Sequence, residues 1–439
     1  QMNTSLKILL LSAAALTLSS LQASAAPSQK PLFLGTSAPP LMMLVMQRDH
    51  KLYYEAYNDA SDLDGDGIPE INFKPTMEYL GYFDSKTCYN YVGSSGRFEP
   101  STKSPSMECS GAWSGNCLNY LTTSRMDALR RVLYGGYRST DTATETVLER
   151  AYIPQDAHSW GKEYAGVAQN GYDITKYAPL AKPSTGKRHL FANLTLYGQT
   201  TPLLRVRENS DNRIWEWLSK ERPVGAGKCD TPSSGVQDCT GSLTDYTVRV
   251  KACVSGVLDG VCTKYSGGGY KPTGLLQKYC ENESMHFGLL TGSYANNKSG
   301  GVLRKNVGIF TDEIDTGTGQ FKLQGDNDAA IVNAINRLKS TGFKSDLSYE
   351  CGWITDKPLP NGTCQMWGNP IGEMMYETVR YFAGASATSN YLTSQNAGEE
   401  STLKLPVASW KDPYKAKSQG GGGAKYCAKP FMLSISDIY

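Results

Sequence analysis

The residues best suited to chemistry form a short acidic run, Asp62-Leu63-Asp64-Gly65-Asp66-Gly67-Ile68-Pro69-Glu70. Acids at its first, third, fifth and ninth positions and a glycine at its sixth are typical of a calcium loop, because they turn several hard oxygen atoms toward one point. An EF-hand would also have a bidentate acid at the twelfth position, but Phe73 stands there, so we predict a shorter loop that Glu70 closes. The predicted Ca²⁺ ligands are Asp62, Asp64, Asp66, the carbonyl oxygen of Ile68, and Glu70.

One alternative to a calcium site is open. The loop could be a hydrated acidic turn that binds no metal, shaped by Gly65, Gly67 and Pro69. For the cysteines, a zinc site is the alternative to disulfides, and it is disfavoured because no two cysteines have the CxxC spacing and the histidines are scattered. These histidines are His50, His158, His189 and His286. If calcium binds, we expect a structural rather than a catalytic role.

The amino terminus has the pattern of an export signal, predicted over residues 1–25. Lys7 precedes an apolar run from Ile8 to Leu18, and Ala23-Ser24-Ala25 follows as a small-residue cleavage site. The apolar run is too short for a comfortable membrane span. An exported protein meets calcium and an oxidising environment, which is consistent with both the acidic loop and the cysteines.

The 11 cysteines suggest local disulfides rather than a disulfide-built miniprotein. Several of them lie close together in the sequence. The pairs predicted from this proximity are Cys109 with Cys117, Cys229 with Cys239, Cys253 with Cys262, and Cys351 with Cys364. Because the count is odd, at least one of Cys88, Cys280 and Cys427 is left unpaired.

The charge balance excludes a strongly basic protein. The chain has 44 Lys and Arg against 42 Asp and Glu, a formal net charge of +2, so no nucleic-acid partner is predicted.

Three segments have the apolar periodicity of helices that pack on a sheet. The first is capped by Asn369 and begun by Pro370, has a stripe of Ile371, Met375, Val379 and Phe382, and ends at Gly384. The second is capped by Asp328, has a stripe of Ile331, Ile335 and Leu338, and is followed by Gly342. The third runs from about Ser114 through Leu118, Leu121, Leu129 and Val132 to Gly135-Gly136. Each stripe is expected to face the core.

Predicted strands alternate with these helices near both ends of the chain, which indicates an α/β sheet, whereas the middle favours β-hairpins and loops. The predicted strands are 41–46, 189–197, 203–206, 246–254, 287–290 and 430–437. The last is expected to be a buried strand that ends in Asp437. Because a finished domain seldom stops there, we expect further sequence in the parent protein.

Several blocks of residues resemble one family in order along nearly the whole chain after residue 25. They are Trp113-Ser114-Gly115-Asn116, Ser124-Arg125-Met126-Asp127-Ala128-Leu129-Arg130, Ile153-Pro154-Gln155-Asp156-Ala157-His158-Ser159-Trp160, Gly300-Gly301-Val302-Leu303-Arg304-Lys305 and Gly368-Asn369-Pro370-Ile371-Gly372-Glu373-Met374-Met375-Tyr376-Glu377. The sequence thereby resembles the PilC/PilY family of type IV pilus tip adhesins and assembly factors. In that family a β-propeller follows this region.

The resemblance implies an exported protein that works by binding, so we predict no enzyme and no catalytic residue. Its role would be type IV pilus biogenesis and tip-associated adhesion, with calcium as a stabilising ion. The partners implied are minor pilins and the pilus tip, a host or abiotic surface receptor, and the outer membrane. The implied location is the outer membrane and cell surface, reached through the periplasm.

The resemblance also implies a fold, a von Willebrand factor A-like three-layer α/β core. We predict that residues 26–439 form such a core, incomplete at the carboxyl end, with large β-rich insertions stapled by disulfides. Residues 50–285 would be the insertion region with the calcium loop, and residues 286–439 would return to the core.

The metal site of A-like domains uses an Asp-x-Ser-x-Ser run after the first strand, a later threonine and an acid after the fourth strand. This sequence departs from that pattern, because Met46-Gln47-Arg48-Asp49-His50-Lys51 contains no serine. Asn369 stands near the position of the threonine, and only Asp437 matches the pattern.

The alternative function is a secreted, calcium-stabilised hydrolase or carbohydrate-binding protein. His158, beside Asp156 and Trp160, is the nearest approach to a catalytic cluster, and a loop histidine satisfied by polar neighbours explains it more simply. The sequence has no Gly-x-Ser-x-Gly elbow, phosphate loop or dinucleotide fingerprint. Paired carboxylates of a glycosidase cannot be chosen from sequence alone.

Overall fold

The computed structural model describes most of the chain after residue 37. The described residues are 38–57, 62, 65–155, 158–217, 242–322, 330–342, 351, 358–391 and 398–436. The chain divides into residues 1–38, of which only Ala38 is described, and residues 39–439. The predicted export signal therefore lies outside the described residues. Within the described part, the helices are too short or too polar to cross a membrane.

A four-stranded sheet joins segments from both ends of the described chain. Its order is β15-β14-β1-β16, with β1 parallel to both β14 and β16 and with β15 antiparallel at one edge. The bounds are Leu41–Met46 for β1, His286–Thr291 for β14, Val302–Gly308 for β15 and Pro430–Ile435 for β16. Strand β1 is apolar throughout because parallel strands are covered on both faces.

The sheet confirms three of the predicted strands and corrects one expectation. Segments 41–46, 287–290 and 430–437 all contain strands, although the last residue of the third, Asp437, is outside the described residues. Strand β16 was expected to be buried, but Phe431 and Leu433 are exposed. The reason is its position: β16 is an edge strand of this sheet.

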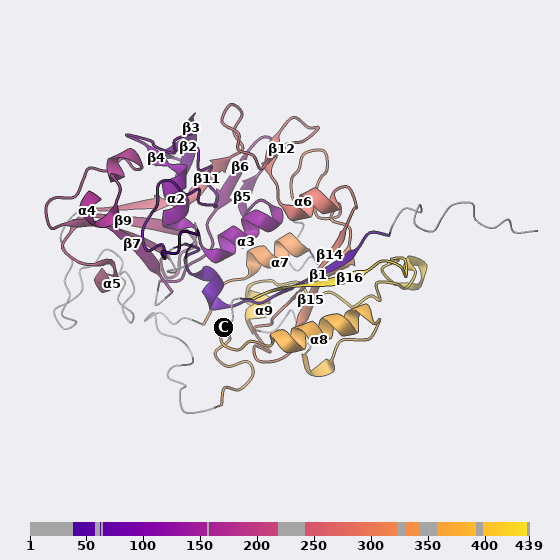
Figure 1. Ribbon diagram of the computed structural model, residues 1–439. Coiled ribbons are helices and arrows are strands. Elements are labelled where there is room, and N and C mark those ends of the chain that lie inside the picture. Colours follow the sequence, from indigo (N-terminus) through magenta and orange to yellow (C-terminus); the bar gives the residue numbers. More distant parts are fainter. Residues whose placement is uncertain are drawn as a thin grey trace, which may run out of the picture. The chain divides into compact units, whose positions relative to one another are not determined.

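Helices cover both faces of the sheet. Figure 1 shows α8 (Ile371–Phe382) on one face and α3 (Arg125–Tyr134) with α7 (Ile331–Arg337) on the other. Leu44 and Met46 belong to a core cluster that also contains residues of α3 and α7, while the intervening Val45 is equally buried on the opposite face. The alternation follows the two-residue period of a strand.

Helix α8 begins and ends as predicted but buries a different face. Met375 and Val379, expected in the core, are exposed, and the buried side chains are instead Met374, Thr378 and Tyr381, together with Glu377. Polar groups can lie on this face because they are satisfied. The Thr378 hydroxyl donates to the Met374 carbonyl oxygen, and the Glu377 carboxylate accepts from the Thr388 amide at 2.9 Å.

Helix α7 confirms the second predicted stripe, since Ile331, Ile335 and Leu338 are all buried. The predicted cap, Asp328, lies outside the described residues. A distant residue serves the helix start: the carboxylate of Glu313 accepts from the backbone N–H groups of Ile331 and Val332 at 2.9 and 3.1 Å. Burial raises the pKa of this carboxyl group.

The third predicted helix is two helices, α2 (Gly115–Thr122) and α3. Ser124 separates them because it forms a capping box with Asp127, which starts a new helix. Gly135 then ends α3 with φ +88°, and a Cβ there would lie 2.2 Å from the Pro272 carbonyl oxygen, so only glycine fits.

Residues between β1 and β14 build mostly β-structure, as the sequence indicates. One sheet has the order β10-β9-β8-β7 and another β4-β2-β3-β11-β6-β5, while β12 and β13 form a hairpin. The bounds are Thr87–Val92 (β2), Arg97–Lys103 (β3), Trp113–Ser114 (β4), Arg138–Asp141 (β5), Thr146–Glu149 (β6), Trp160–Tyr164 (β7), Arg188–Thr195 (β8), Pro202–Ser210 (β9), Ser242–Thr247 (β10), Arg249–Ala252 (β11), Cys262–Lys264 (β12) and Tyr270–Pro272 (β13). The predicted strand 246–254 is thus divided between two sheets.

Short helices complete the described part of the chain. They are η3 (His50–Tyr53), α4 (Val167–Asn170), η4 (Ile174–Lys176), α5 (Ile214–Trp217), α6 (Leu275–Cys280), η6 (Ser389–Tyr391), α9 (Gly398–Thr402) and η7 (Lys417–Gln419). The described residues therefore form a mixed α/β structure with several sheets.

Three disulfides join described cysteines: Cys88–Cys109, Cys253–Cys262 and Cys351–Cys364. The last two were predicted. The predicted pair of Cys109 with Cys117 is wrong, because Cys117 lies buried inside α2, where burial raises the pKa of its free thiol to about 12. Cys280 and Cys427 are also free, and Cys229 and Cys239 lie outside the described residues.

Candidate metal site

The acidic loop folds around the carboxylate of Asp62. Its two oxygens accept from the backbone N–H groups of Gly65 at 2.7 Å, Asp66 at 3.1 Å and Gly67 at 2.8 Å. Gly65 and Gly67 have φ values of +80° and +85°, which glycine adopts without strain. The glycines thus allow the tight turn that the spacing predicts.

Three of the predicted ligands lie together. Asp62, Asp66 and Glu70 each place one carboxylate oxygen within 4.8 Å of the others. The side chain of Ile68 points to solvent, being 65% exposed, and its N–H donates to Asp66 Oδ1 at 2.8 Å. Asp64 lies outside the described residues. A set of carboxylate oxygens this close is chemically suited to a hard cation such as Ca²⁺.

Lys74 is a residue of this site that the sequence analysis missed. Its ammonium lies 3.2 Å from Asp66 Oδ2 and 2.5 Å from Glu70 Oε1, so it links two of the three carboxylates. A hydrogen bond from the Ile68 N–H and the charge of Lys74 lower the pKa of Asp66. The four-residue spacing of Glu70 and Lys74 was a usable signal.

The chain just after the loop is fixed firmly. Phe73 is buried, with its ring centroid 5.1 Å from that of Tyr172 and 5.3 Å from that of Tyr177. The amide of Asn170 donates to Asn72 Oδ1 at 3.1 Å. Ordering the loop would therefore brace an aromatic core that also contains Tyr79 and Tyr120.

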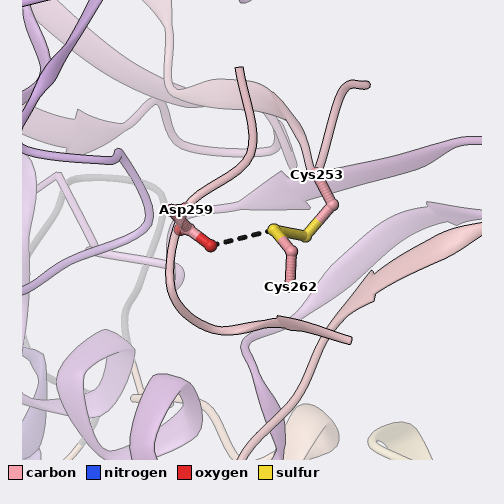
Figure 2. Close-up of side chains that lie close together, drawn as sticks. All are labelled: Cys253, Asp259 and Cys262. Carbon is pink, nitrogen blue, oxygen red and sulfur yellow. Dashed lines mark hydrogen bonds between the residues drawn. A yellow bond between two sulfur atoms is a disulfide. The ribbon is translucent and has the colours of Figure 1, made fainter. Parts of the chain in front are cut away.

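A second cluster of residues that could hold a metal by their spacing is unsuited to one. Cys253, Asp259 and Cys262 also bring their ligand atoms close together, but both sulfurs belong to one disulfide, as Figure 2 shows. A disulfide sulfur has no thiolate charge to offer a metal. Asp259 is in addition held by Arg131, whose Nη2 lies 2.7 Å from its carboxylate.

The residues at the carboxyl ends of the parallel strands differ from those of a metal site. Gln47 Nε2 donates to Asn369 Oδ1 at 2.7 Å, so Asn369 lies beside the residue that follows β1. Arg48, 1% exposed, donates from Nε to the Ser293 carbonyl oxygen at 2.7 Å. A buried guanidinium beside these groups repels a cation, and the described residues therefore do not fit an adhesion-type metal site.

Two of the four histidines, His50 and His158, lie close together in space although they are distant in sequence. The ring centroids of His50 and His158 are 5.1 Å apart, and Tyr54 stacks on His158 at 5.6 Å. His158 is only 2% exposed, so it offers a substrate little access. Asp156, its expected neighbour, lies outside the described residues.

Comparison with known proteins finds one family. Family models described as the PilY1 homolog small alpha/beta domain and the PilY1 homolog second domain match residues 70–214 and 287–439. Two relatives from Xylella fastidiosa (strain Temecula1 / ATCC 700964) are each named type IV pilus biogenesis factor PilY1 homolog. One is 48% identical over 412 residues, 90% of this chain and 28% of the relative.

The other relative is 28% identical over 453 residues, 94% of this chain and 33% of the relative. The chain thus spans a third or less of the length of either relative. No solved structure matches it.

Proposed function

Because this chain belongs to the family of PilY1 homologs, we propose that its parent protein is exported and acts in type IV pilus biogenesis. The single observation that carries the proposal is the 48% identity over 90% of this chain to a protein named for that role. The export signal predicted over residues 1–25 and the predicted place at the pilus tip belong to the same proposal.

We further propose that the sheet around β1 is the start of a von Willebrand factor A-like core. The topology supports this, because a parallel trio of β14, β1 and β16 has an antiparallel strand, β15, at its edge and helices on both faces. The insertion between β1 and β14 supplies extensive loops, and loops carried on a rigid sheet are where recognition residues usually collect. An adhesive role without turnover is therefore proposed, with minor pilins and a surface receptor as partners.

Calcium is the third part of the proposal. Asp62, Asp66 and Glu70 would hold the ion with Asp64 and the Ile68 carbonyl oxygen, and Lys74 would have to move its ammonium aside. The ion would supply a structural crosslink between the loop and the aromatic core next to it.

A gene deletion tests the pilus role directly. We expect fewer surface pili and less attachment in the deletion strain, restored by the intact gene. If the role is in extension, blocking retraction in the deletion strain should restore some pili. Normal piliation and normal adherence of the deletion strain would contradict the proposal, and hydrolysis of a polysaccharide by the purified protein would favour the enzyme instead.

A further inference from the structure

A basic pocket of about 350 Å³ lies where three distant parts of the chain meet. Its walls include Arg130 of α3, Arg249 of β11, and Lys339, which follows α7. Arg150 is the fourth cation of the lining, and Glu149 is its one carboxylate. A cavity of this size is at the small end of the range for ligand sites, roughly 300 to 1,000 Å³.

Two of the four cations are occupied by the protein itself. The guanidinium of Arg150 donates to Asn193 Oδ1 at 2.6 Å and to the Leu194 carbonyl oxygen at 2.9 Å. Arg249 Nε lies 2.5 Å from Glu149 Oε2, so the single carboxylate of the lining is neutralised. These two arginines shape the pocket and leave two further cations in its lining, Lys339 and Arg130, that make no ion pair among the described residues.

Lys339 is the first of these two cations, and the charge of Glu149 only partly offsets the effects of its burial and of Arg130. Among the described residues its ammonium makes no ion pair, and it lies 5.6 Å from the ring centroid of Tyr152. Burial and then the positive charge of Arg130 lower the pKa of Lys339. A bound anion would relieve both effects, because it would replace lost hydration and separate two like charges.

Arg130 is the second cation of the pocket that makes no ion pair among the described residues. It is 3% exposed and donates from Nη2 to the carbonyl oxygens of Ile335 and Asn336 at 3.1 and 3.2 Å, which fixes the guanidinium plane. Its Nε is buried without a hydrogen-bond acceptor among the described residues. The carboxylate of Asp127 offsets part of the charge of Arg130 through space, while its oxygens accept from the Ser124 hydroxyl and the Ala151 N–H.

The rest of the lining is neutral and suited to a sugar. Tyr137 and Tyr152 contribute aromatic rings beside Arg130 and Lys339, at 5.5 and 5.6 Å from these cations. Ser139, Thr200 and Asn336 contribute hydroxyl and amide groups. Aromatic rings beside a few polar groups are common where a small polar ligand is oriented. We propose that this pocket binds a sugar acid, one or two saccharide units with a carboxylate that Lys339 and Arg130 share. The inference rests on the proposed adhesive function, for which it names a receptor class.

The test is calorimetric titration of the purified exported protein with digalacturonate, with a neutral digalactoside and with inorganic phosphate. We expect saturable binding of digalacturonate only, weakened by added salt because the contact is ionic. Lys339→Gln should lower the affinity by about tenfold or more, since a hydrogen bond to a charged group is worth about 1.5–3 kcal/mol. The matched control is Lys298→Gln, an exposed lysine outside the pocket, which should leave affinity unchanged.

Thermal melting of both variants shows whether they fold. Lys339→Gln should melt at or above the wild-type temperature, because it removes a partly buried charge that makes no ion pair among the described residues. Lys339→Arg keeps the charge and should retain most of the binding. Absence of digalacturonate binding by the wild type, or equal binding by Lys339→Gln, would overturn the inference. Phosphate binding as tight as digalacturonate binding would also overturn it, since the sugar would then contribute nothing.

The two proposals fail separately. If cells that carry Lys339→Gln keep normal pili but lose adhesion to surfaces coated with polygalacturonate, both proposals stand. If the deletion strain has normal pili while the protein binds digalacturonate through Lys339, the pilus role falls and the pocket stands. If deletion removes pili and no sugar acid binds, the pocket assignment falls alone.

Discussion

The charges behind the parallel sheet and the charges of the acidic loop are arranged in opposite ways. Arg304 and Glu400 are fully buried, 2.8 Å apart, and the guanidinium also donates to Thr291 Oγ1 and to the Pro406 carbonyl oxygen. Asp62 and Asp66 lie at the surface, four residues apart in sequence. The buried pair is complete within the protein, whereas the loop gathers three carboxylates, two of which share the ammonium of Lys74.

The difference teaches where a lost charge matters. Removing one partner of a buried pair leaves the other in a medium that cannot hydrate it. Removing the carboxylate of Asp62 or Asp66, both exposed, leaves groups that water can still reach, so the effect should depend on whether a metal is bound. The following experiments separate these cases, from the largest expected effect to the smallest.

Glu400→Gln should reduce the free energy of unfolding by about 3–5 kcal/mol, because Arg304 would remain buried without its carboxylate. Urea denaturation measures the loss. The matched control is Glu78→Gln, which breaks an exposed pair with Lys86 and should change stability by less than about 1 kcal/mol. Equal effects at the two positions would contradict the contrast drawn above.

The disulfide Cys88–Cys109 should contribute about 3 kcal/mol by restricting the unfolded chain across a separation of 21 residues. Peptide mapping without reduction should recover this pair and a free Cys117. Cys88→Ser should lower the denaturation midpoint in the exported protein, and the control Cys117→Ala should leave the crosslink intact. Recovery of a Cys109–Cys117 peptide would reverse the correction made by the structure.

Calcium at saturation should stabilise the wild-type protein by about 2.7 kcal/mol when its concentration is 100 times the dissociation constant. Asp62→Asn should remove most of that gain, because it takes away a ligand charge at the centre of the loop. Melting curves with calcium and with chelator give the comparison. The control is Asp315→Asn, a similar exposed turn aspartate that accepts from Gly317 and Thr318 outside the acidic loop. Identical wild-type melting in both conditions would sink the calcium site.

The smallest effect concerns pH. Burial lowers the pKa of His286 in β14 below its ordinary value of 6.5. The folded state therefore favours the neutral ring, so its contribution to stability is present above pH 6.5 and is lost as pH falls through the lower folded pKa. His286→Gln should flatten this part of the stability profile. A profile with unchanged slope below pH 6.5 would show that the histidine is not its source.

Local patterns foresaw much of the fold. The apolar run at residues 41–46 predicts β1, and Pro370 and Gly384 bracket α8 correctly. The buried face of α8 was not predictable, because periodicity favours the more apolar stripe of Met375 and Val379. The face that is buried carries Glu377 and Thr378, whose polar groups find partners in Thr388 and in the helix backbone. Proximity in sequence likewise misled the pairing of Cys109, since the fold brings Cys88 to it instead.

The candidate sites show the same limit. Asp62, Asp66 and Glu70 could be grouped from spacing because one short loop carries them. The basic pocket has no such signature, since Arg130, Arg249 and Lys339 meet only when the sheets and α7 are assembled. Lys74 is an intermediate case. It is close to the loop in sequence, but only the structure shows that its ammonium contacts two of the carboxylates.

The pairing of β1 with both β14 and β16 has a consequence in time. Leu41 lies opposite His286 on one side and Pro430 on the other. Both partner strands of β1 are therefore distant in sequence and are synthesised much later than β1. Such long-range pairing closes large loops and folds slowly. Pulse-labelling hydrogen exchange during refolding should show β1 amides protected after those of the hairpin β8–β9, and protection in the reverse order would contradict this. During export, β1 would cross the membrane before its partner strands and would be exposed to aggregation. A chaperone would then have to bind the chain until residue 435 has crossed the membrane.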